Sequence, residues 1–183
     1  MALSDARRRD LAALVRDYGY ERRDQAFQLS SGGWSRDYVD GKHAVAAGAA
    51  LRLAAQAVID VVAEPFDAVG GPTMGADALA HGVSVVSGAG WFSVRKEAKG
   101  HGRRAWVEGT RLAEGDRVVI VEDVVSTGAS LLRAVERVVD LGASVVAATA
   151  LLDRSPAVGR RFAERGIDWR PLLTWDDVGI EPL

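Results

Sequence analysis

The sequence predicts an α/β fold in which helices flank a central parallel sheet, and two observations support that class. From residue 66 onward, short apolar runs typical of buried strands alternate with segments of helical spacing. The clearest run, Arg117 to Val121, is almost entirely β-branched, as a strand buried on both faces requires. A length of 183 residues suits one domain, which we expect to cover residues 1–183. Ligands bind at the carboxyl ends of strands in such sheets, so the polar residues after each run are the first candidates for a site.

The N-terminal part predicts a helix followed by a small hood. Ser4 suits the N-cap of the helix, which Gly19 ends. Segment 27–42 mixes glycines, hydroxyls and aromatics, which favours a short hairpin or irregular hood with a turn at Ser30 to Gly33. We expect about residues 1–42 to contribute the hood. The inward face of the helix is expected to carry Leu11, Leu14, Val15 and Tyr18.

A second helix and a series of strands complete the expected order. Asp40 suits the N-cap of a long helix that runs to about Ala63, and Ser155 suits the N-cap of a later helix that ends near Gly166. The turn from 70 to 77 leaves backbone amides exposed between strand and helix, as a second anion-binding loop would. The long helix is expected to bury Val45, Leu51, Val58 and Val62. Further strands are expected at 66–70, 83–86, 91–94, 104–108, 145–152 and 169–173.

Two adjacent acids, Glu122 and Asp123, end the β-branched run, and a polar loop leads from them into a helix. Small hydroxyl residues and a glycine at such a junction leave backbone N–H groups free to bind an anion, assisted by the positive end of the helix dipole. We therefore predict that the loop binds a phosphate. The residues after the acids are Val124, Val125, Ser126, Thr127, Gly128, Ala129 and Ser130.

The paired acids narrow the expected ligand. Carboxylates beside a phosphate site would repel the ligand unless they bound sugar hydroxyls or a divalent cation, so ribose carrying phosphate is the expected chemistry. The chain has neither a lysine after the loop glycine nor a GxGxxG after a strand, which argues against a P-loop and a Rossmann fingerprint. A buried strand followed by a plainly capped helix is the alternative, and it explains everything except the two acids.

Composition excludes several classes of function. The formal net charge is −2 with 26% charged residues, so no global field favours nucleic acid or an acidic membrane surface. Without cysteine there is no disulfide framework or thiolate metal site. No signal-like core begins the chain, and no apolar stretch reaches the roughly 20 residues that a bilayer span needs. We expect a cytoplasmic protein that binds neither nucleic acid nor membranes.

The segment VVIVEDVVSTGAS, Val118 to Ser130, resembles the signature of the type I phosphoribosyltransferases. In that family the two acids bind the ribose hydroxyls of phosphoribosyl pyrophosphate (PRPP), and the loop binds its 5′-phosphate. The basic segment RKEAKGHG, Arg95 to Gly102, resembles the catalytic loop of the orotate phosphoribosyltransferases. Further matches occur in family order at LSSG (29–32), DYVD (37–40), GGPTMGAD (70–77), EG (108–109) and DR (153–154).

This resemblance implies an enzyme that joins orotate to PRPP with Mg²⁺, giving orotidine 5′-monophosphate and pyrophosphate in pyrimidine biosynthesis. It implies a five-stranded parallel sheet under the N-terminal hood, and a homodimer in which the basic loop serves the neighbouring subunit's active site. The resemblance implies that Mg²⁺ is held mainly through PRPP and not by a set of protein ligands. Glu122 and Asp123 are the residues that could contact the ion.

The matched positions carry the expected roles. Ser126 and Arg154 match contacts to orotate, with the guanidinium pairing the orotate carboxylate. Asp123 is also expected to be essential for catalysis, beside its contact with ribose. The residues expected to contact the pyrophosphate end of PRPP and act in catalysis are Arg95, Lys96, Lys99 and His101.

The sequence departs from the family pattern at three places. Serine stands at Ser31 where many members have lysine, the 70–77 segment lacks a lysine that some relatives carry, and Asp37 occupies a position where an aromatic commonly sits. A paralogue that acts on another base therefore stays open, as does a non-catalytic regulator that senses PRPP. Two roles are left open for Trp34: its ring could stack on a base or cover the core. His43 and His81 are expected to be surface or packing residues rather than metal ligands.

Overall fold

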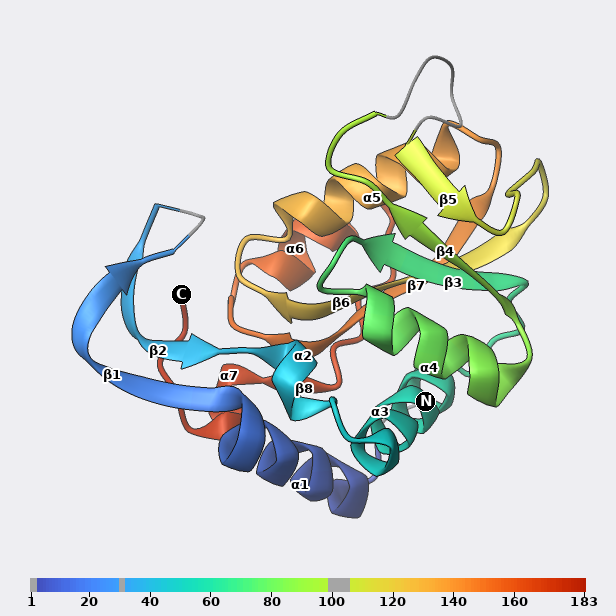
Figure 1. Ribbon diagram of the computed structural model, residues 1–183. Coiled ribbons are helices and arrows are strands. Elements are labelled where there is room, and N and C mark those ends of the chain that lie inside the picture. Colours follow the sequence, from blue (N-terminus) through green and yellow to red (C-terminus); the bar gives the residue numbers. More distant parts are fainter. Residues whose placement is uncertain (1–2, 30–31, 99–105) are drawn as a thin grey trace.

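The computed structural model describes residues 3–29, 32–98 and 106–183, and it places a six-stranded sheet at the centre of the molecule (Figure 1). The strand order is β5-β4-β3-β6-β7-β8, and every neighbouring pair is parallel except β4 with the edge strand β5. The predicted α/β class with a parallel core is therefore confirmed. The strands are β3 (Ala68–Pro72), β4 (Gly90–Val94), β5 (Val107–Gly109), β6 (Arg117–Val125), β7 (Ser144–Asp153) and β8 (Leu173–Thr174).

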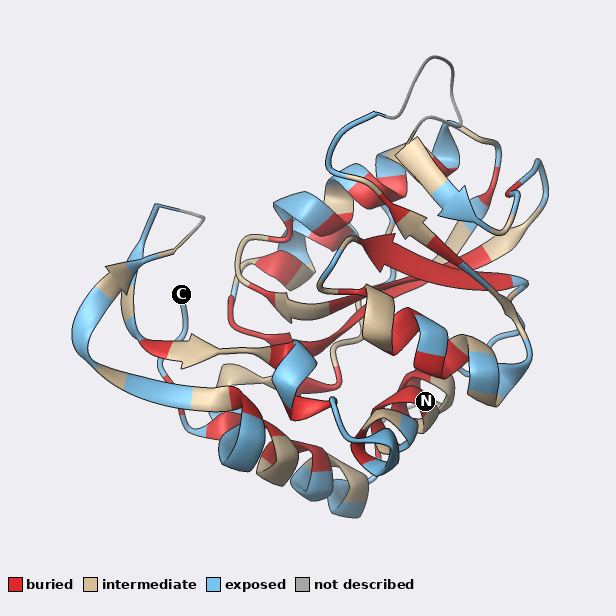
Figure 2. Ribbon diagram, in the orientation of Figure 1, coloured by how far each residue is buried: buried red, intermediate tan, exposed pale blue. Residues whose placement is uncertain are grey.

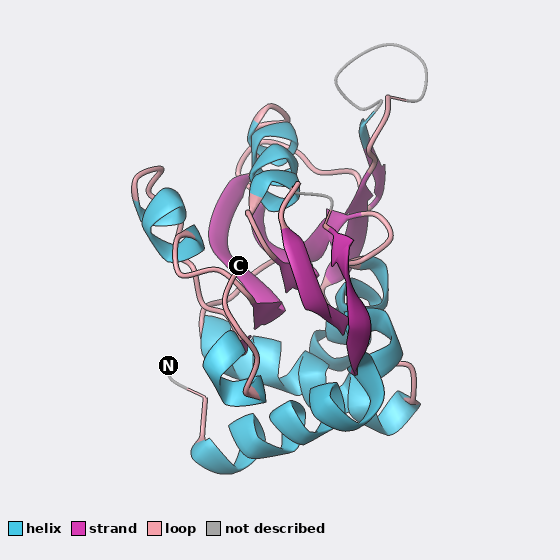
Figure 3. Ribbon diagram, turned by 90° about the vertical axis from the view of Figure 1, so that its left-hand side faces the viewer, coloured by secondary structure: helices cyan, strands magenta, loops and turns pink. Residues whose placement is uncertain are grey.

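Helices cover both faces of the sheet (Figure 3). Strand alternation explains the two cores, because Val119 and Val121 of β6 point to one face and Val118 and Ile120 to the other. All four side chains are fully buried, which is why the sequence shows an unbroken apolar run. One core is covered by α1 (Asp5–Leu14), α3 (Gly48–Val62) and α4 (Asp77–Ser87), and the other by α5 (Ala129–Val139) and α6 (Val158–Ala163).

The first helical segment begins and ends where predicted, at Ser4 and Gly19, but its last turn is not α-helical. The Ser4 side chain accepts a hydrogen bond from the backbone N–H of Arg7, which confirms the N-cap. The last turn, Val15–Gly19, is a π-helix. Because a π-turn has more residues than an α-turn, it rotates the following side chains away from the helix's buried face. Tyr18 is accordingly 61% exposed, so its predicted place on that face is wrong.

The hood is a two-stranded antiparallel hairpin of β1 (Tyr20–Gln28) and β2 (Trp34–Val39), which projects beside the sheet (Figures 1 and 2). The prediction of a hairpin is confirmed, although β1 starts seven residues before the expected segment because its exposed charged residues hide the alternation. Leu29 and Gly33 close the hairpin through a 2.8 Å backbone hydrogen bond. Ser30 and Ser31 lie outside the described residues. Trp34 is 68% exposed, which excludes the interpretation that it covers the core.

The long second helix is interrupted. Asp40 caps a short α2 (Gly41–Ala44), accepting hydrogen bonds from the N–H groups of Lys42 and His43 at 3.0 and 3.1 Å. The chain then leaves the helical conformation at Val45 and restarts as α3 after the extended Ala47. The break lets Val45 turn into the core, where it is buried. Of the other predicted core positions, Val58 and Val62 are buried and Leu51 is half-buried.

Several boundaries differ from expectation in the second half. Residues 83–86, predicted as a strand, belong to α4, since Leu79, Ala80 and Val83 face the core at helical spacing. β6 continues through the two acids to Val125, because β7 pairs with it as far as Asp153. Helix α6 starts at Val158, so Ser155 is not its N-cap. The predicted last strand is reduced to one bridge at Trp169 and to β8, and α7 (Trp175–Val178) follows.

No helix in the described part of the chain combines the length and the hydropathy that crossing a bilayer requires.

Candidate active site

A cavity of about 670 Å³ opens at the carboxyl ends of β3, β4 and β6. The parallel sheet explains its position, because the loops that follow neighbouring strands gather at one edge. It is lined by acids from β6, by backbone from the β3–α4 loop and by basic side chains from three segments. The lining residues are Lys42, Pro72, Thr73, Met74, Gly75, Val94, Arg95, Lys96, Trp106, Glu122, Asp123, Val124, Ser130, Arg133, Ala134 and Arg137.

The predicted phosphate loop encloses a smaller hollow of about 110 Å³ beside this cavity, lined by Glu122 and residues 124–131. Gly128 has a φ of 73°, a conformation that favours glycine, and it precedes the first residue of α5. A Cβ at this position would also lie 2.9 Å from the Phe162 ring. The glycine therefore lets the chain turn sharply into α5, so that the positive end of this eleven-residue helix faces the hollow.

Glu122 is a buried carboxyl group, 8% exposed, within β6. Burial, together with the neighbouring charge of Asp123, raises its pKa to about 9. Without ligand, Glu122 is thus protonated at neutral pH. This state removes the repulsion between two adjacent carboxylates in a region with little water.

Asp123 is the more accessible acid, and it lies in the strand rather than in the loop expected after it. Its Oδ1 accepts a 2.8 Å hydrogen bond from the N–H of Val124, and its Oδ2 lies 3.5 Å from Nζ of Lys42. The Lys42 ammonium also pairs with Asp40 at 3.0 Å, which links the site to the end of the hood. Asp123 is therefore held as a charged acceptor at the cavity wall.

The β3–α4 loop packs against the two acids through the backbone of Gly75, which has no side chain. A Cβ on Gly75 would stand 2.4 Å from Oδ1 of Asp123 and 2.5 Å from Oε1 of Glu122. No side chain larger than hydrogen fits there while both acids keep their positions. The peptide bond between Thr73 and Met74 in this loop is cis. The predicted second anion loop thus lies directly against the acids, within the same cavity.

Basic side chains also line this cavity. Arg95 forms a 2.9 Å ion pair with Glu108 of β5, and Lys96 follows it on the cavity wall. Arg133 donates a 3.2 Å hydrogen bond to Oγ of Ser130, and the Arg137 guanidinium stacks over the Trp106 ring at 4.2 Å. These groups create a positive region next to the acids, as a ligand with both phosphate and hydroxyl groups requires.

Comparison with known proteins agrees with this arrangement. The model of the phosphoribosyl transferase domain matches residues 42–167. The chain belongs to the phosphoribosyltransferase family. The orotate phosphoribosyltransferase of Methanothermobacter thermautotrophicus is 39% identical over 170 residues, covering 93% of each chain. That of Rhodopirellula baltica is 35% identical, covering 98% of this chain and 99% of its own. The predicted resemblance to orotate phosphoribosyltransferases is confirmed.

A solved structure supports the fold of this phosphoribosyltransferase. The orotate phosphoribosyltransferase of Mycobacterium tuberculosis H37Rv in complex with PRPP superposes with a TM-score of 0.79 at 32% identity. The match covers 95% of this chain and 99% of that one. The overall fold is therefore that of the family.

The structure brings most of the predicted site residues of this phosphoribosyltransferase to one edge of the sheet. Arg95, Lys96, Glu122, Asp123 and Ser130 line the large cavity, and the rest of the phosphate loop lines the hollow beside it. Lys99 and His101 lie outside the described residues.

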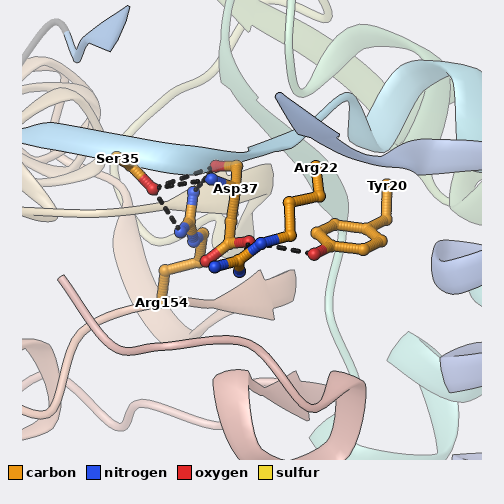
Figure 4. Close-up of polar contacts among 5 residues, drawn as sticks. All are labelled: Tyr20, Arg22, Ser35, Asp37 and Arg154. Atoms are coloured by element: carbon orange, nitrogen blue, oxygen red, sulfur yellow. Dashed lines mark hydrogen bonds and ion pairs between the residues drawn. The ribbon is translucent and has the colours of Figure 1, made fainter. Parts of the chain in front are cut away.

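Arg154 is placed differently from the other predicted site residues. It is 3% exposed and does not line the large cavity, although its backbone N–H donates to Val125, the residue before Ser126. Its guanidinium contacts the hood instead (Figure 4). Arg154 is therefore beside the phosphate loop and beneath the hairpin.

Three basic residues of the site were not predicted from the sequence. Two of them, Arg133 and Arg137, follow the predicted Ser130 at i+3 and i+7 along α5. Helical spacing could therefore have predicted that they share its face of the helix and reach the cavity. Lys42 gave no such signal, because its approach to Asp123 depends on how α2 packs against β6.

His43 and His81 lie at the surface, as the sequence predicts. His81 packs against Trp91 with ring centroids 4.4 Å apart, and its ring contacts the backbone oxygen of Asp77. His43 is exposed. Over residues 3–29, 32–98 and 106–183, no three histidine or acidic side chains are grouped as metal ligands.

The pKa of Glu122 predicts a pH dependence of stability. From about pH 4.5 to about pH 9 the folded protein holds a proton that the unfolded chain releases, so the free energy of unfolding falls as pH rises. For one proton the fall reaches about 2.7 kcal/mol between pH 6 and pH 8. Glu122→Gln, which is neutral at every pH, is expected to lose most of this dependence. Urea unfolding of both proteins at the two pH values, without metal or PRPP, measures it.

Glu136→Gln provides the matched control, because Glu136 is exposed on α5 and should keep the wild-type pH dependence. An unchanged slope in Glu122→Gln would mean that Glu122 is ionised in the folded protein.

Proposed function

We propose that this protein transfers the phosphoribosyl group of PRPP to orotate, giving orotidine 5′-monophosphate and pyrophosphate. In this reaction the bond between ribose C1 and the pyrophosphate oxygen breaks, a bond from C1 to a ring nitrogen of orotate forms, and the proton of that nitrogen is released. The observation that carries the proposal is that one edge of the sheet joins a phosphate loop, two acids and a basic segment. These are the groups that the phosphate, ribose and pyrophosphate of PRPP need.

Each part of PRPP has a proposed contact. The 5′-phosphate binds the backbone amides and hydroxyls of residues 126–130, at the positive end of α5. The ribose hydroxyls bind Glu122 and Asp123, with Asp123 as the charged acceptor. Arg95 and Lys96 face the pyrophosphate, and the resemblance gives Lys99 and His101 the same role. Positive charge at this end stabilises the charge that develops on the departing pyrophosphate.

The acids also fit Mg²⁺ bound together with PRPP. This ion prefers oxygen ligands and keeps several waters, so one or two protein carboxylates beside a polyphosphate suffice. Glu122 and Asp123 are adjacent acids on the wall of the large cavity, where their carboxyl groups could share such an ion with PRPP. Mg²⁺ would neutralise phosphate charge, while the chain's own residues orient the ribose.

Orotate is proposed to bind between the phosphate loop and the hood. Ser126 offers a hydroxyl from the loop, and Arg154 offers a planar guanidinium from the end of β7. The Nε of Arg154 is buried and has no hydrogen-bond partner in the described part of the chain. An unsatisfied buried donor of this kind is costly, and a carboxylate oxygen would satisfy it.

Turnover tests the role of the basic loop. Lys99→Ala is expected to lower kcat more than it raises the KM for PRPP, because a charge that acts on the leaving group is needed mainly in the transition state. Steady-state kinetics with varied PRPP measures the two effects. A higher KM with unchanged kcat would assign Lys99 to ground-state binding instead.

Mixing variants tests the proposed shared site of a homodimer. Lys99→Ala chains combined with Asp123→Asn chains should recover activity, because some heterodimers would pair an intact basic loop with an intact ribose site. Purified heterodimers without activity would mean that the loop serves its own subunit.

One assay separates the proposed function from its alternatives. PRPP and Mg²⁺ are incubated in parallel with orotate, uracil, hypoxanthine and adenine, and the nucleotide products are quantified. The proposal predicts product with orotate. Product only with another base supports a paralogue. Absence of product with all four, despite measurable PRPP binding, supports a regulator that senses PRPP.

A further inference from the structure

Asp37 is a buried carboxylate on the hood, at the position where the hood departs from the family pattern (Figure 4). Strand alternation places it: Arg22 lies directly opposite Asp37 in the hairpin, and Tyr20 and Ser35 lie two residues away on the same face. Only 3% of Asp37 is exposed, although most of the hairpin is open to solvent. This face of the hairpin is thus polar and turned inward.

The carboxylate of Asp37 is bound by two donors from β1. The hydroxyl of Tyr20 and Nη1 of Arg22 each donate to Oδ1 at 2.9 Å. Burial and the bond to Asp37 raise the pKa of Tyr20, so this hydroxyl stays a neutral donor at physiological pH. Arg22 remains partly in water while its partner is buried. The pair fixes the inner end of the hairpin, since a buried carboxylate without a partner is strongly destabilising.

The backbone of the same residue binds Arg154, which follows β7 and is more than 100 residues away in sequence. Nη1 of Arg154 donates to the carbonyl oxygen of Asp37 at 2.8 Å, and Oγ of Ser35 donates to that oxygen at 3.2 Å. The contact of Nη2 with Oγ of Ser35 is longer, at 3.4 Å. One nitrogen of the guanidinium is firmly held, whereas Nη2 is weakly bound and Nε lacks a partner in the described part of the chain.

We propose that Asp37 is a positioning residue for base recognition: it locks the hairpin through Tyr20 and Arg22, and its carbonyl holds Nη1 of Arg154 so that the remaining donors face a planar carboxylate. The inference rests on the proposed function and adds a determinant of specificity outside the cavity. Asp37 itself does not touch the base. Its carboxylate acts on the hairpin, its carbonyl acts on Arg154, and Arg154 acts on the ligand.

The lock should matter for the carboxylate of the base and not for PRPP. Asp37, Tyr20 and Arg22 do not line the cavity at the acids or the hollow of the phosphate loop. Loosening the hairpin therefore leaves those groups in place, while Arg154 loses its fixed acceptor. The ratio of kcat/KM for orotate to that for uracil, which lacks the carboxylate, is the quantity that should fall.

The test compares Asp37→Ala, Asp37→Asn and Tyr20→Phe with wild type. The apparent KM for orotate is expected to rise by about tenfold or more in Asp37→Ala, a size typical of coupled contacts, and by less in the two milder variants. The KM for PRPP should stay within about twofold of wild type, since distant sites are nearly independent. Asp24→Asn is the matched control, because Asp24 is an exposed carboxylate on the same hairpin, and it should leave both values unchanged.

A double-mutant cycle with Arg154→Ala distinguishes positioning from general loosening. If Asp37 acts through Arg154, Asp37→Ala should add less than about a twofold rise in orotate KM once Arg154 is removed. Equal effects in both backgrounds, or equal rises in the KM for orotate and PRPP, would overturn the proposal. Should Asp37→Ala fail to fold, Asp37→Asn and Tyr20→Phe decide the outcome by the same criteria.

The activity of the wild-type protein distinguishes failure of the proposed role of Asp37 from failure of the proposed function. Wild type that makes no orotidine 5′-monophosphate from orotate and PRPP overturns both. Wild type that makes it, together with Asp37 variants of unchanged orotate KM, overturns the role of Asp37 alone.

Discussion

Asp123→Asn is expected to lower kcat/KM for PRPP by about a hundredfold, which corresponds to about 3 kcal/mol for the charge-assisted hydrogen bonds that a ribose-binding carboxylate makes. Asparagine keeps the shape of the side chain and the oxygen that accepts from Val124. The loss therefore falls on the ligand rather than on packing. Steady-state kinetics with PRPP and direct titration of PRPP measure it.

The free energy of unfolding of Asp123→Asn is the second quantity to measure. The pair between Asp123 and Lys42 spans 3.5 Å at the cavity wall, with the lysine side chain 44% exposed, so its loss should change the free energy of unfolding by less than about 1 kcal/mol. Asp24→Asn makes the same chemical change on the exposed hairpin and should leave activity intact. If Asp123→Asn kept wild-type PRPP affinity and turnover, the proposed ribose site would be contradicted.

Arg154→Ala is expected to weaken orotate by about 2 to 5 kcal/mol, the range for truncating one partner of a buried charge pair. PRPP binding should stay nearly intact, because Arg154 lines neither the large cavity nor the phosphate hollow. The KM and the dissociation constant for orotate, each measured at saturating PRPP, give the effect.

Arg154→Lys is the informative companion to that variant. Lysine keeps the positive charge but lacks the planar fork that binds a carboxylate through two nitrogens, so it should recover only part of the loss. Full recovery would show that charge alone matters. If Arg154→Ala weakens PRPP and spares orotate, the paralogue that acts on another base takes the place of the orotate assignment.

The parts of the fold and site that could be predicted from the sequence are those with local causes. The β-branched run of β6 and the glycine before α5 are set by local sequence, and both lie where the sequence indicates. The strand at 91–94 and the N-cap at Ser4 are of the same kind. Local sequence determines these elements because burial on both faces and a positive φ each demand particular residue types.

Features that depend on distant partners could not be predicted in the same way. The acids belong to β6 because β7 pairs with it to its end, and residues 83–86 are helical because α4 packs on α3. The polar face of the hairpin also contacts Arg154, which is far away in sequence. Asp37 was recognised as unusual from the sequence, whereas its contacts with Tyr20 and Arg22 required the hairpin register.

The reverse reaction tests the central claim most directly, because it needs the base, ribose phosphate and pyrophosphate sites together. Orotidine 5′-monophosphate is incubated with pyrophosphate and Mg²⁺, and orotate and PRPP are quantified, with uridine 5′-monophosphate as the matched substrate without the carboxylate. We expect orotate and PRPP in equal amounts, only when pyrophosphate is present, and little cleavage of uridine 5′-monophosphate. Absence of orotate from a folded protein that binds PRPP, or equal cleavage of both nucleotides, would contradict the proposed function.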